Sequence, residues 1–201
     1  MFLAALVPAM LLAGGALGVG PKQLGADPVR TLLHSCGLTA LNLLLITLAV
    51  TPLRQLTGWN NVQRLRRMLG LFAFFYALLH FTVYAWLDQG LDVKAIGADI
   101  LKRPYITIGM LALLMLIPLA VTSTNGWMRR LRKRWQRLHY LIYPIAILGV
   151  WHFWWQVKKD IREPLLYVVM LGVLLGYRLL RAPLRRLLTS RCGSATVRER
   201  T

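Results

Sequence analysis

Long apolar stretches separated by short charged segments dominate the pattern of this chain. A helix that crosses the hydrocarbon core of a bilayer needs about 20 mostly apolar residues. Six stretches, bounded by charges and by Pro or Gly, reach or approach that length, and they predict helices over about 1–20, 29–53, 68–87, 104–122, 138–157 and 164–180. The sequence therefore predicts an all-α integral membrane protein built as a six-helix bundle.

The stretch 1–20 has the length of a signal peptide as well as that of a spanning helix. A signal peptide starts with a positively charged region, whereas the first basic residue here is Lys22. We therefore expect 1–20 to be a retained helix. Residues 1–180 then form one transmembrane domain, and 181–201 form a basic tail without a core of its own.

Composition supports a membrane protein. Hydrophobic residues make up 57% of the chain and charged residues 16%, with a mean hydropathy of +0.53, whereas soluble domains carry about 25% charged residues. Cys36 and Cys192 match neither a disulfide framework nor a zinc-site spacing. These features exclude secreted disulfide scaffolds, zinc domains and disordered tails.

The net charge of +18 raises the question of nucleic-acid binding, which the distribution of the charges answers. Segments 54–67, 129–137 and 178–200 together carry seventeen basic residues and one acid. The segments on the other side of the predicted membrane carry eight basic and six acidic residues. Cytoplasmic loops are enriched in Lys and Arg, so we predict that both termini are cytoplasmic. The arginines then face anionic lipid headgroups rather than nucleic acid.

All four histidines of the chain lie within predicted helices. Ionisable residues inside a span are costly and mark functional sites. The deep parts of the spans hold no Asp, Glu, Lys or Arg, which argues against an ion pump, a proton-coupled transporter or a voltage sensor. The histidines are therefore the candidates for chemistry.

His80 and His152 are predicted to lie at similar depth. They precede Asp88 by eight residues and Lys158 by six, which places them about 9–12 Å below the outer boundary at the helical rise. Both helices run outward, so the two imidazoles can face each other. Imidazole binds haem iron, and bundles build cofactor sites from facing helices. The pattern predicts a b-type haem between them; the alternative is a pair of histidines that only hydrogen-bond between helices.

His139 lies thirteen residues before His152, about 20 Å farther inward, which suits a second haem. On an ideal helix its ring is about 140° away from that of His152, unless Pro144 kinks or unwinds the helix. The matching position on the helix of His80 is Arg66 or Arg67. An interfacial histidine that only hydrogen-bonds is the alternative.

His34 is predicted at the outer edge of its helix, beside Ser35 and Cys36. We interpret it as an ordinary boundary histidine, with contact to a haem propionate or to a partner as the alternative. The chain contains no Gly-rich phosphate-binding motif, and its tail is too short for a nicotinamide or FAD domain. Electrons would therefore come from a separate donor or a lipid-soluble carrier.

Several motifs carry a family resemblance. They are GADPVR (Gly25–Arg30), LLLITLAVTPLRQL (Leu43–Leu56), RRMLGLFAFFYALLHFTVY (Arg66–Tyr84), KRPYITIGM (Lys102–Met110), PLAVTST (Pro118–Thr124), WQRLHYLIYPIAILGVWHFWWQVK (Trp135–Lys158) and EPLLY (Glu163–Tyr167). Over Gly25 to Arg181 these runs resemble the MsrQ family, formerly YedZ, the haem-binding membrane subunits of periplasmic methionine-sulfoxide reductase systems.

The resemblance implies a member of the ferric-reductase-like transmembrane superfamily in the bacterial inner membrane. Such a subunit binds b-type haem, is associated with FMN, and passes electrons from a cytoplasmic flavin reductase or the quinone pool to a periplasmic molybdopterin subunit. That partner repairs methionine sulfoxide in oxidised envelope proteins. The chain would be the electron-transfer subunit rather than the catalytic one.

The resemblance also assigns residues. The family's haem histidines fall on His80, His139 and His152, and a further histidine of the family matches His34. There is no second histidine near Arg66 or Arg67, so the number of bound haems, one or two, stays open. Arg66, Arg67 and Arg137 are candidate contacts for the FMN phosphate.

Two other functions are compatible with the sequence: a stand-alone ferric or quinone-dependent reductase, and a non-redox membrane scaffold whose histidines only pack. If a protein partner accepts the electrons, we expect it to dock on the outer segments Trp86–Arg103 and Lys158–Glu163.

Overall fold

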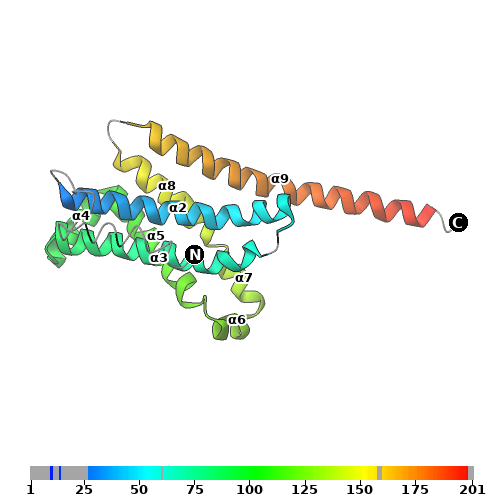
Figure 1. The fold of residues 1–201 in the computed structure, drawn as a ribbon, viewed down its shortest axis with the longest axis horizontal. Coiled ribbons are helices and arrows are strands. Elements are labelled where there is room, and N and C mark those ends of the chain that lie inside the picture. Colours follow the sequence, from blue (N-terminus) through cyan, green and yellow to red (C-terminus); the bar gives the residue numbers. More distant parts are fainter. Residues whose placement is uncertain (1–9, 11–13, 15–26, 60, 158–159, 199–201) are drawn as a thin grey trace.

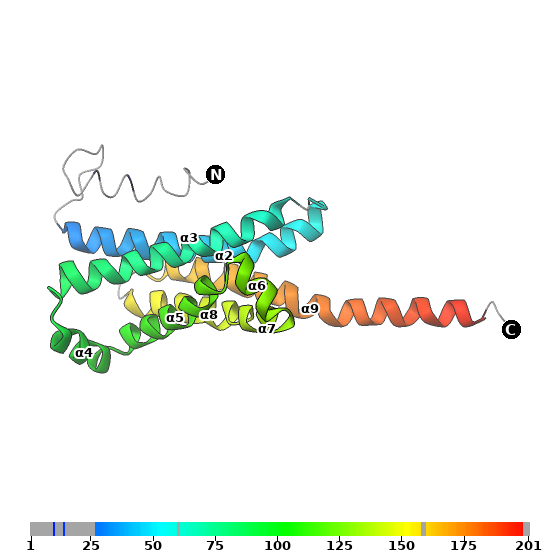
Figure 2. The same cartoon turned by 90° about the horizontal axis from the view of Figure 1, so that it is seen from below.

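The computed structural model describes residues 10, 14, 27–59, 61–157 and 160–198, and the regular structure within these ranges is helical. The elements form an elongated bundle, from which the end of α9 projects (Figures 1 and 2). They are α2 (Pro28–Thr57), α3 (Val62–Val83), the π-helix η1 (Tyr84–Asp88), α4 (Val93–Lys102), α5 (Pro104–Val121), α6 (Asn125–Leu131), α7 (Lys133–His139), α8 (Ile142–Gln156) and α9 (Arg162–Arg198).

Four helical stretches in the described part of the chain are long and apolar enough to cross a membrane. They are Pro28–Thr57, Leu65–Asp88, Pro104–Val121 and Arg162–Leu180. They coincide with four of the six predicted spans. The predicted helix 1–20 lies outside the described residues except for Met10 and Gly14, so the six-helix bundle stays a prediction.

Capping residues explain where α2 begins and ends. The carboxylate of Asp27 accepts a hydrogen bond from the backbone N–H of Arg30 at 3.0 Å, and Pro28 occupies the first turn. The helix continues through Pro52 and stops at Gly58, whose φ of 70° gives the left-handed cap and whose N–H bonds to the Arg54 carbonyl. The predicted end near residue 53 was therefore too early.

The predicted continuous helix 138–157 was wrong, because the structure divides this segment between α7 and α8. Pro144 has no N–H to donate to the carbonyl of Tyr140. The turn at Tyr140 and Leu141 is held instead by bonds to residues three positions back, from Tyr140 N to Arg137 O and from Leu141 N to Leu138 O. His139 and His152 therefore belong to different helices.

Two other predicted helices are longer in the structure. The helix of His80 begins at Val62 and continues beyond Val83 as η1, so its last turn is π-helical. The helix predicted over 164–180 continues as α9 to Arg198, so the backbone of the predicted tail is helical through that residue (Figure 2).

Leucines of α2 and α5 and aliphatic residues of α8 form the core of the bundle. Leu45 and Ala146 are almost completely buried within it. Large apolar side chains also cover the outside, among them Leu114 on α5 and Val173 on α9. A soluble protein rarely exposes so much apolar surface, so this outer surface suits contact with lipid tails.

Shortening a buried and an exposed side chain of α2 should distinguish the stability that comes from core packing from that of the outer surface. Leu45 is 1% exposed, whereas its neighbour Ile46 is 50% exposed. We expect Leu45→Ala to lower the free energy of unfolding by about 2–5 kcal/mol through loss of buried contacts. Ile46→Ala is the matched control and should have a much smaller effect. Unfolding of the detergent-solubilised full chain measures both, and equal losses would contradict this packing.

Candidate functional site

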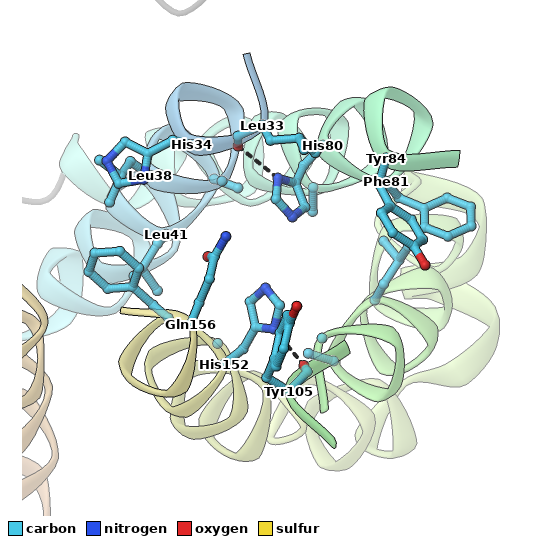
Figure 3. Close-up of a pocket in the computed structure, with 18 of the residues that line it drawn as sticks. Leu33, His34, Leu38, Leu41, His80, Phe81, Tyr84, Tyr105, His152 and Gln156 are labelled. Atoms are coloured by element: carbon cyan, nitrogen blue, oxygen red, sulfur yellow. Dashed lines mark hydrogen bonds between the residues drawn. The ribbon is translucent and has the colours of Figure 1, made fainter. Parts of the chain in front are cut away.

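A cavity of about 840 Å³ lies between the α2–α3 pair and the α5–α8 pair. Figure 3 shows these two pairs on opposite sides of the cavity. Leu44, Leu116 and Ile145 line its deep end, while Asp88 and Asp160 line the end near the predicted outer boundary. An apolar interior with a few polar groups at the mouth is typical of a site for a small molecule or cofactor, whose volumes are about 300–1,000 Å³.

His80 of α3 and His152 of α8 point toward each other across this cavity (Figure 3). Their ring centroids are 6.1 Å apart and their ring planes are almost perpendicular, at 83°. The structure thus brings together the two histidines that depth alone had paired.

Each imidazole is oriented by a backbone carbonyl of the neighbouring helix. Nδ1 of His80 lies 2.9 Å from the carbonyl oxygen of Leu33 in α2, and Nδ1 of His152 lies 2.6 Å from that of Tyr105 in α5. A carbonyl oxygen only accepts, so both Nδ1 atoms carry the proton and donate. Both Nε2 atoms then keep a free lone pair, as a neutral histidine that binds a metal requires.

This geometry fits a single iron between the rings. A metal ion that lies about 2.0–2.1 Å from an imidazole nitrogen, as zinc does, would fit between two rings whose centroids are 6.1 Å apart. Within the described ranges, no cluster of three or more His, Cys, Asp or Glu could hold a metal ion. Two facing imidazoles therefore suit an iron whose other ligands come from a macrocycle, as in haem.

The same kinds of residue recur on the two sides of the cavity, at a constant spacing along the sequence. This repeat was missed when the sequence was considered alone. Pairs of residues 72 positions apart line the cavity, one member from the α2–α3 side and the other from the α5–α8 side. They are Leu33 and Tyr105, Gly37 and Gly109, Leu44 and Leu116, His80 and His152, Phe81 and Phe153, and Asp88 and Asp160. The recurring His-Phe pair, with a glycine 43 residues before each histidine, was the signal available in the sequence.

Basic side chains stand at the mouth of the cavity. Arg30 and Arg103 both line it. The guanidinium of Arg103 is 3.5 Å from the hydroxyl of Tyr105 and 3.4 Å from the carboxylate of Asp99. These two neighbours raise the pKa of Arg103 above its ordinary value. Arg103 therefore stays protonated at any physiological pH, beside the carboxylates of Asp88 and Asp160 that line the same end of the cavity.

His139 is outside the cavity, near the opposite end of the bundle. Its ring stacks on that of Trp135, with centroids 3.8 Å apart, and its Nδ1 lies 3.1 Å from the Trp135 carbonyl. The position 72 residues earlier is Arg67, whose guanidinium bonds to the side chain of Asn125. The described residues therefore bring no second histidine to His139.

A cluster of polar residues surrounds His139. Arg66 is close enough to interact electrostatically with His139, Tyr143 and Arg178. The guanidinium of Arg178 lies 4.8 Å from the centroid of the Tyr143 ring. The Tyr143 hydroxyl is buried and has no hydrogen-bond partner among the described residues. Among the described residues, the groups that interact with Arg66 and His139 include a second arginine and no carboxylate, so this cluster suits an anionic group.

His34 lines the rim of the cavity without facing the two imidazoles. Its ring is exposed and lies 6.1 Å from that of Phe153. In Figure 3 it lies away from the gap between His80 and His152. The structure thus separates His34 from the facing pair.

Known proteins match most of the chain. The family described as ferric reductase like transmembrane component matches residues 36–150. Two relatives are each named "Protein-methionine-sulfoxide reductase heme-binding subunit MsrQ". That of Xanthomonas campestris pv. campestris (strain 8004) is 59% identical over 86% of this chain and 79% of its own length. That of Herminiimonas arsenicoxydans is 50% identical over 89% of this chain and 82% of its own. No solved structure matches the chain.

Proposed function

The chain belongs to the MsrQ family of ferric-reductase-like membrane proteins, and we propose that it carries electrons across the bacterial inner membrane through a b-type haem. The acceptor is a periplasmic molybdopterin methionine-sulfoxide reductase, which repairs oxidised methionines. The observation that supports this proposal most directly is the facing pair of His80 and His152, whose free Nε2 atoms point into one cavity.

In this proposal His80 and His152 would hold the haem iron, and the carbonyls of Leu33 and Tyr105 keep both rings in the tautomer that leaves Nε2 free. Haem iron supplies one-electron chemistry, because it alternates between its ferric and ferrous states. The apolar depth of the cavity keeps water from the ring. Arg30 and Arg103 at the mouth suit the two anionic propionates of a haem.

The inner half of the membrane needs a second carrier, because the facing pair lies toward the outer boundary. We assign this role to FMN rather than to a second haem, since His139 has no partner histidine. Arg66 and Arg178, near His139, offer positive charge for the FMN phosphate. A cytoplasmic flavin reductase or the quinone pool would then reduce the flavin.

Substitution of each histidine should identify the axial ligands. We expect about one haem per wild-type chain, measured as pyridine haemochrome on detergent-purified protein. His80→Ala and His152→Ala should each lose most of it, because one imidazole no longer completes the axial pair. His34→Ala and His139→Ala are the controls and should retain it. Loss of half the haem in His139→Ala would instead indicate that the chain binds two haems. A purified wild-type protein without haem absorbance would favour the non-redox scaffold.

Electron delivery should depend on the protein partner. In membranes that contain the full chain, we expect methionine sulfoxide to reoxidise the reduced b-type absorbance only when the molybdoenzyme is added. His80→Ala should abolish this reoxidation. If a soluble ferric chelate reoxidises the haem at the full rate without the partner, the stand-alone reductase is the better description.

The charge distribution predicts the orientation of the bundle. A periplasmic reporter such as alkaline phosphatase should be active when fused after Gly90, near the mouth of the cavity. It should be inactive after Arg132, since basic segments remain in the cytoplasm. The reverse pattern of activity would place the cavity on the cytoplasmic side and exclude outward delivery of electrons.

A further inference from the structure

Each of the two facing imidazoles lies over a glycine of the neighbouring helix. A methyl group at Gly37 of α2 would lie 3.2 Å from both Nδ1 and Cε1 of His80. A methyl group at Gly109 of α5 would lie 2.8 Å from Nδ1 and 2.9 Å from Cε1 of His152. Non-bonded carbon atoms pack best at about 3.5–4.0 Å, so either methyl would press on the ring.

Helix geometry explains why a glycine is needed at each of these positions. In an α-helix the carbonyl of residue i points toward residue i+4. A donor that reaches the Leu33 carbonyl from another helix therefore passes over position 37, and one that reaches the Tyr105 carbonyl passes over position 109. The carbonyl thus accepts the hydrogen bond of the ring, and the glycine leaves room for the ring. We call each such carbonyl–glycine pair the seat of its imidazole.

Other glycines of the bundle do not share this close approach. A methyl at Gly149, on the helix of His152, would lie 3.5 Å from a methyl of Leu41. At Gly70, on the helix of His80, the nearest atom would be a methyl of Thr47 at 4.0 Å. Both are ordinary packing distances. Among these four glycines, only Gly37 and Gly109 adjoin an imidazole.

We infer that Gly37 and Gly109 are positioning residues that set the tilt and the hydrogen bonding of the two axial imidazoles. This inference rests on the proposed function, because it assumes that His80 and His152 bind haem iron. A methyl at either position moves the ring away from its carbonyl or moves Nε2 away from the iron axis. The residue acts through the histidine and does not itself touch the iron.

The two seats differ in how much room they leave. The gap at Gly109 is narrower than that at Gly37, and the Tyr105 carbonyl is also closer to its imidazole than the Leu33 carbonyl is. The same substitution should therefore disturb His152 more than His80. The larger effect on His152 follows from the smaller space between its ring and Gly109.

The experiment compares Gly37→Ala and Gly109→Ala with the matched control Gly70→Ala in the detergent-purified full chain. All three place an alanine in a helix, so helix propensity changes equally. Haem content, the low-spin fraction of the ferric haem by electron paramagnetic resonance, and the midpoint potential are measured. An imidazole without its carbonyl acceptor is a weaker electron donor, so the ferric form loses stabilisation and the potential rises.

The expected result is a positive shift of the potential with a larger high-spin fraction, or loss of haem, in the order Gly109→Ala greater than Gly37→Ala. Gly70→Ala should match the wild type. If Gly109→Ala does not fold, the milder Gly37→Ala decides. Wild-type spectra and potentials in the folded glycine variants would overturn the inference.

The histidine variants separate this failure from a failure of the proposed function. If His80→Ala and His152→Ala lose haem while both glycine variants resemble the wild type, only the positioning role is wrong. If the histidine variants retain full haem, the proposed ligands are wrong and the inference fails with them.

Discussion

The hydrogen bond from each imidazole to a carbonyl of the neighbouring helix is the constraint on which the rest of the structure depends. It ties α3 to α2 through His80 and Leu33, and α8 to α5 through His152 and Tyr105. A single such bond contributes only about 0.5–1.5 kcal/mol. An unpaired Nδ1–H in a hydrocarbon environment would cost more. The two bonds therefore fix which nitrogen is free, and both free nitrogens face the same point of the cavity.

The repeat at 72 residues shows how one arrangement supplies both ligands. Each helix pair contributes a carbonyl, a glycine four residues later and a histidine followed by phenylalanine. In both pairs the helix of the carbonyl precedes the helix of the histidine. Two copies placed on opposite sides of the cavity bring the imidazoles together on one axis (Figure 3). The leucines of α2 and α5 that line the deep end of the cavity also belong to the core that packs the bundle.

The repeat is incomplete toward the other end of the bundle, so the two ends have different chemical surroundings. Arg67 stands where His139 would need a partner, and the turn at Tyr140 and Leu141 separates α7 from α8. The cluster around His139 is basic, whereas the cavity mouth combines basic and acidic residues. The two ends of the bundle therefore differ in charge: the cluster around His139 suits an anionic group, and the cavity mouth brings charges of both signs together.

Hydropathy and charge determined much of this protein without any structure. Apolar length is a local property, so four predicted spans coincide with helices of the structure. The pairing of His80 with His152 was predicted from helical rise, and the structure brings these two rings together. The effect of Pro144 was foreseen only as one option, because the sequence does not say whether neighbouring helices restore a broken helix. The carbonyls of Leu33 and Tyr105 and the glycines beneath the rings were missed. Any residue can offer a backbone carbonyl, so the sequence does not mark these acceptors. The role of a glycine can be predicted only when the ring that packs over it is known. Tertiary packing alone decided these features, because they depend on distances between helices that are far apart in the chain.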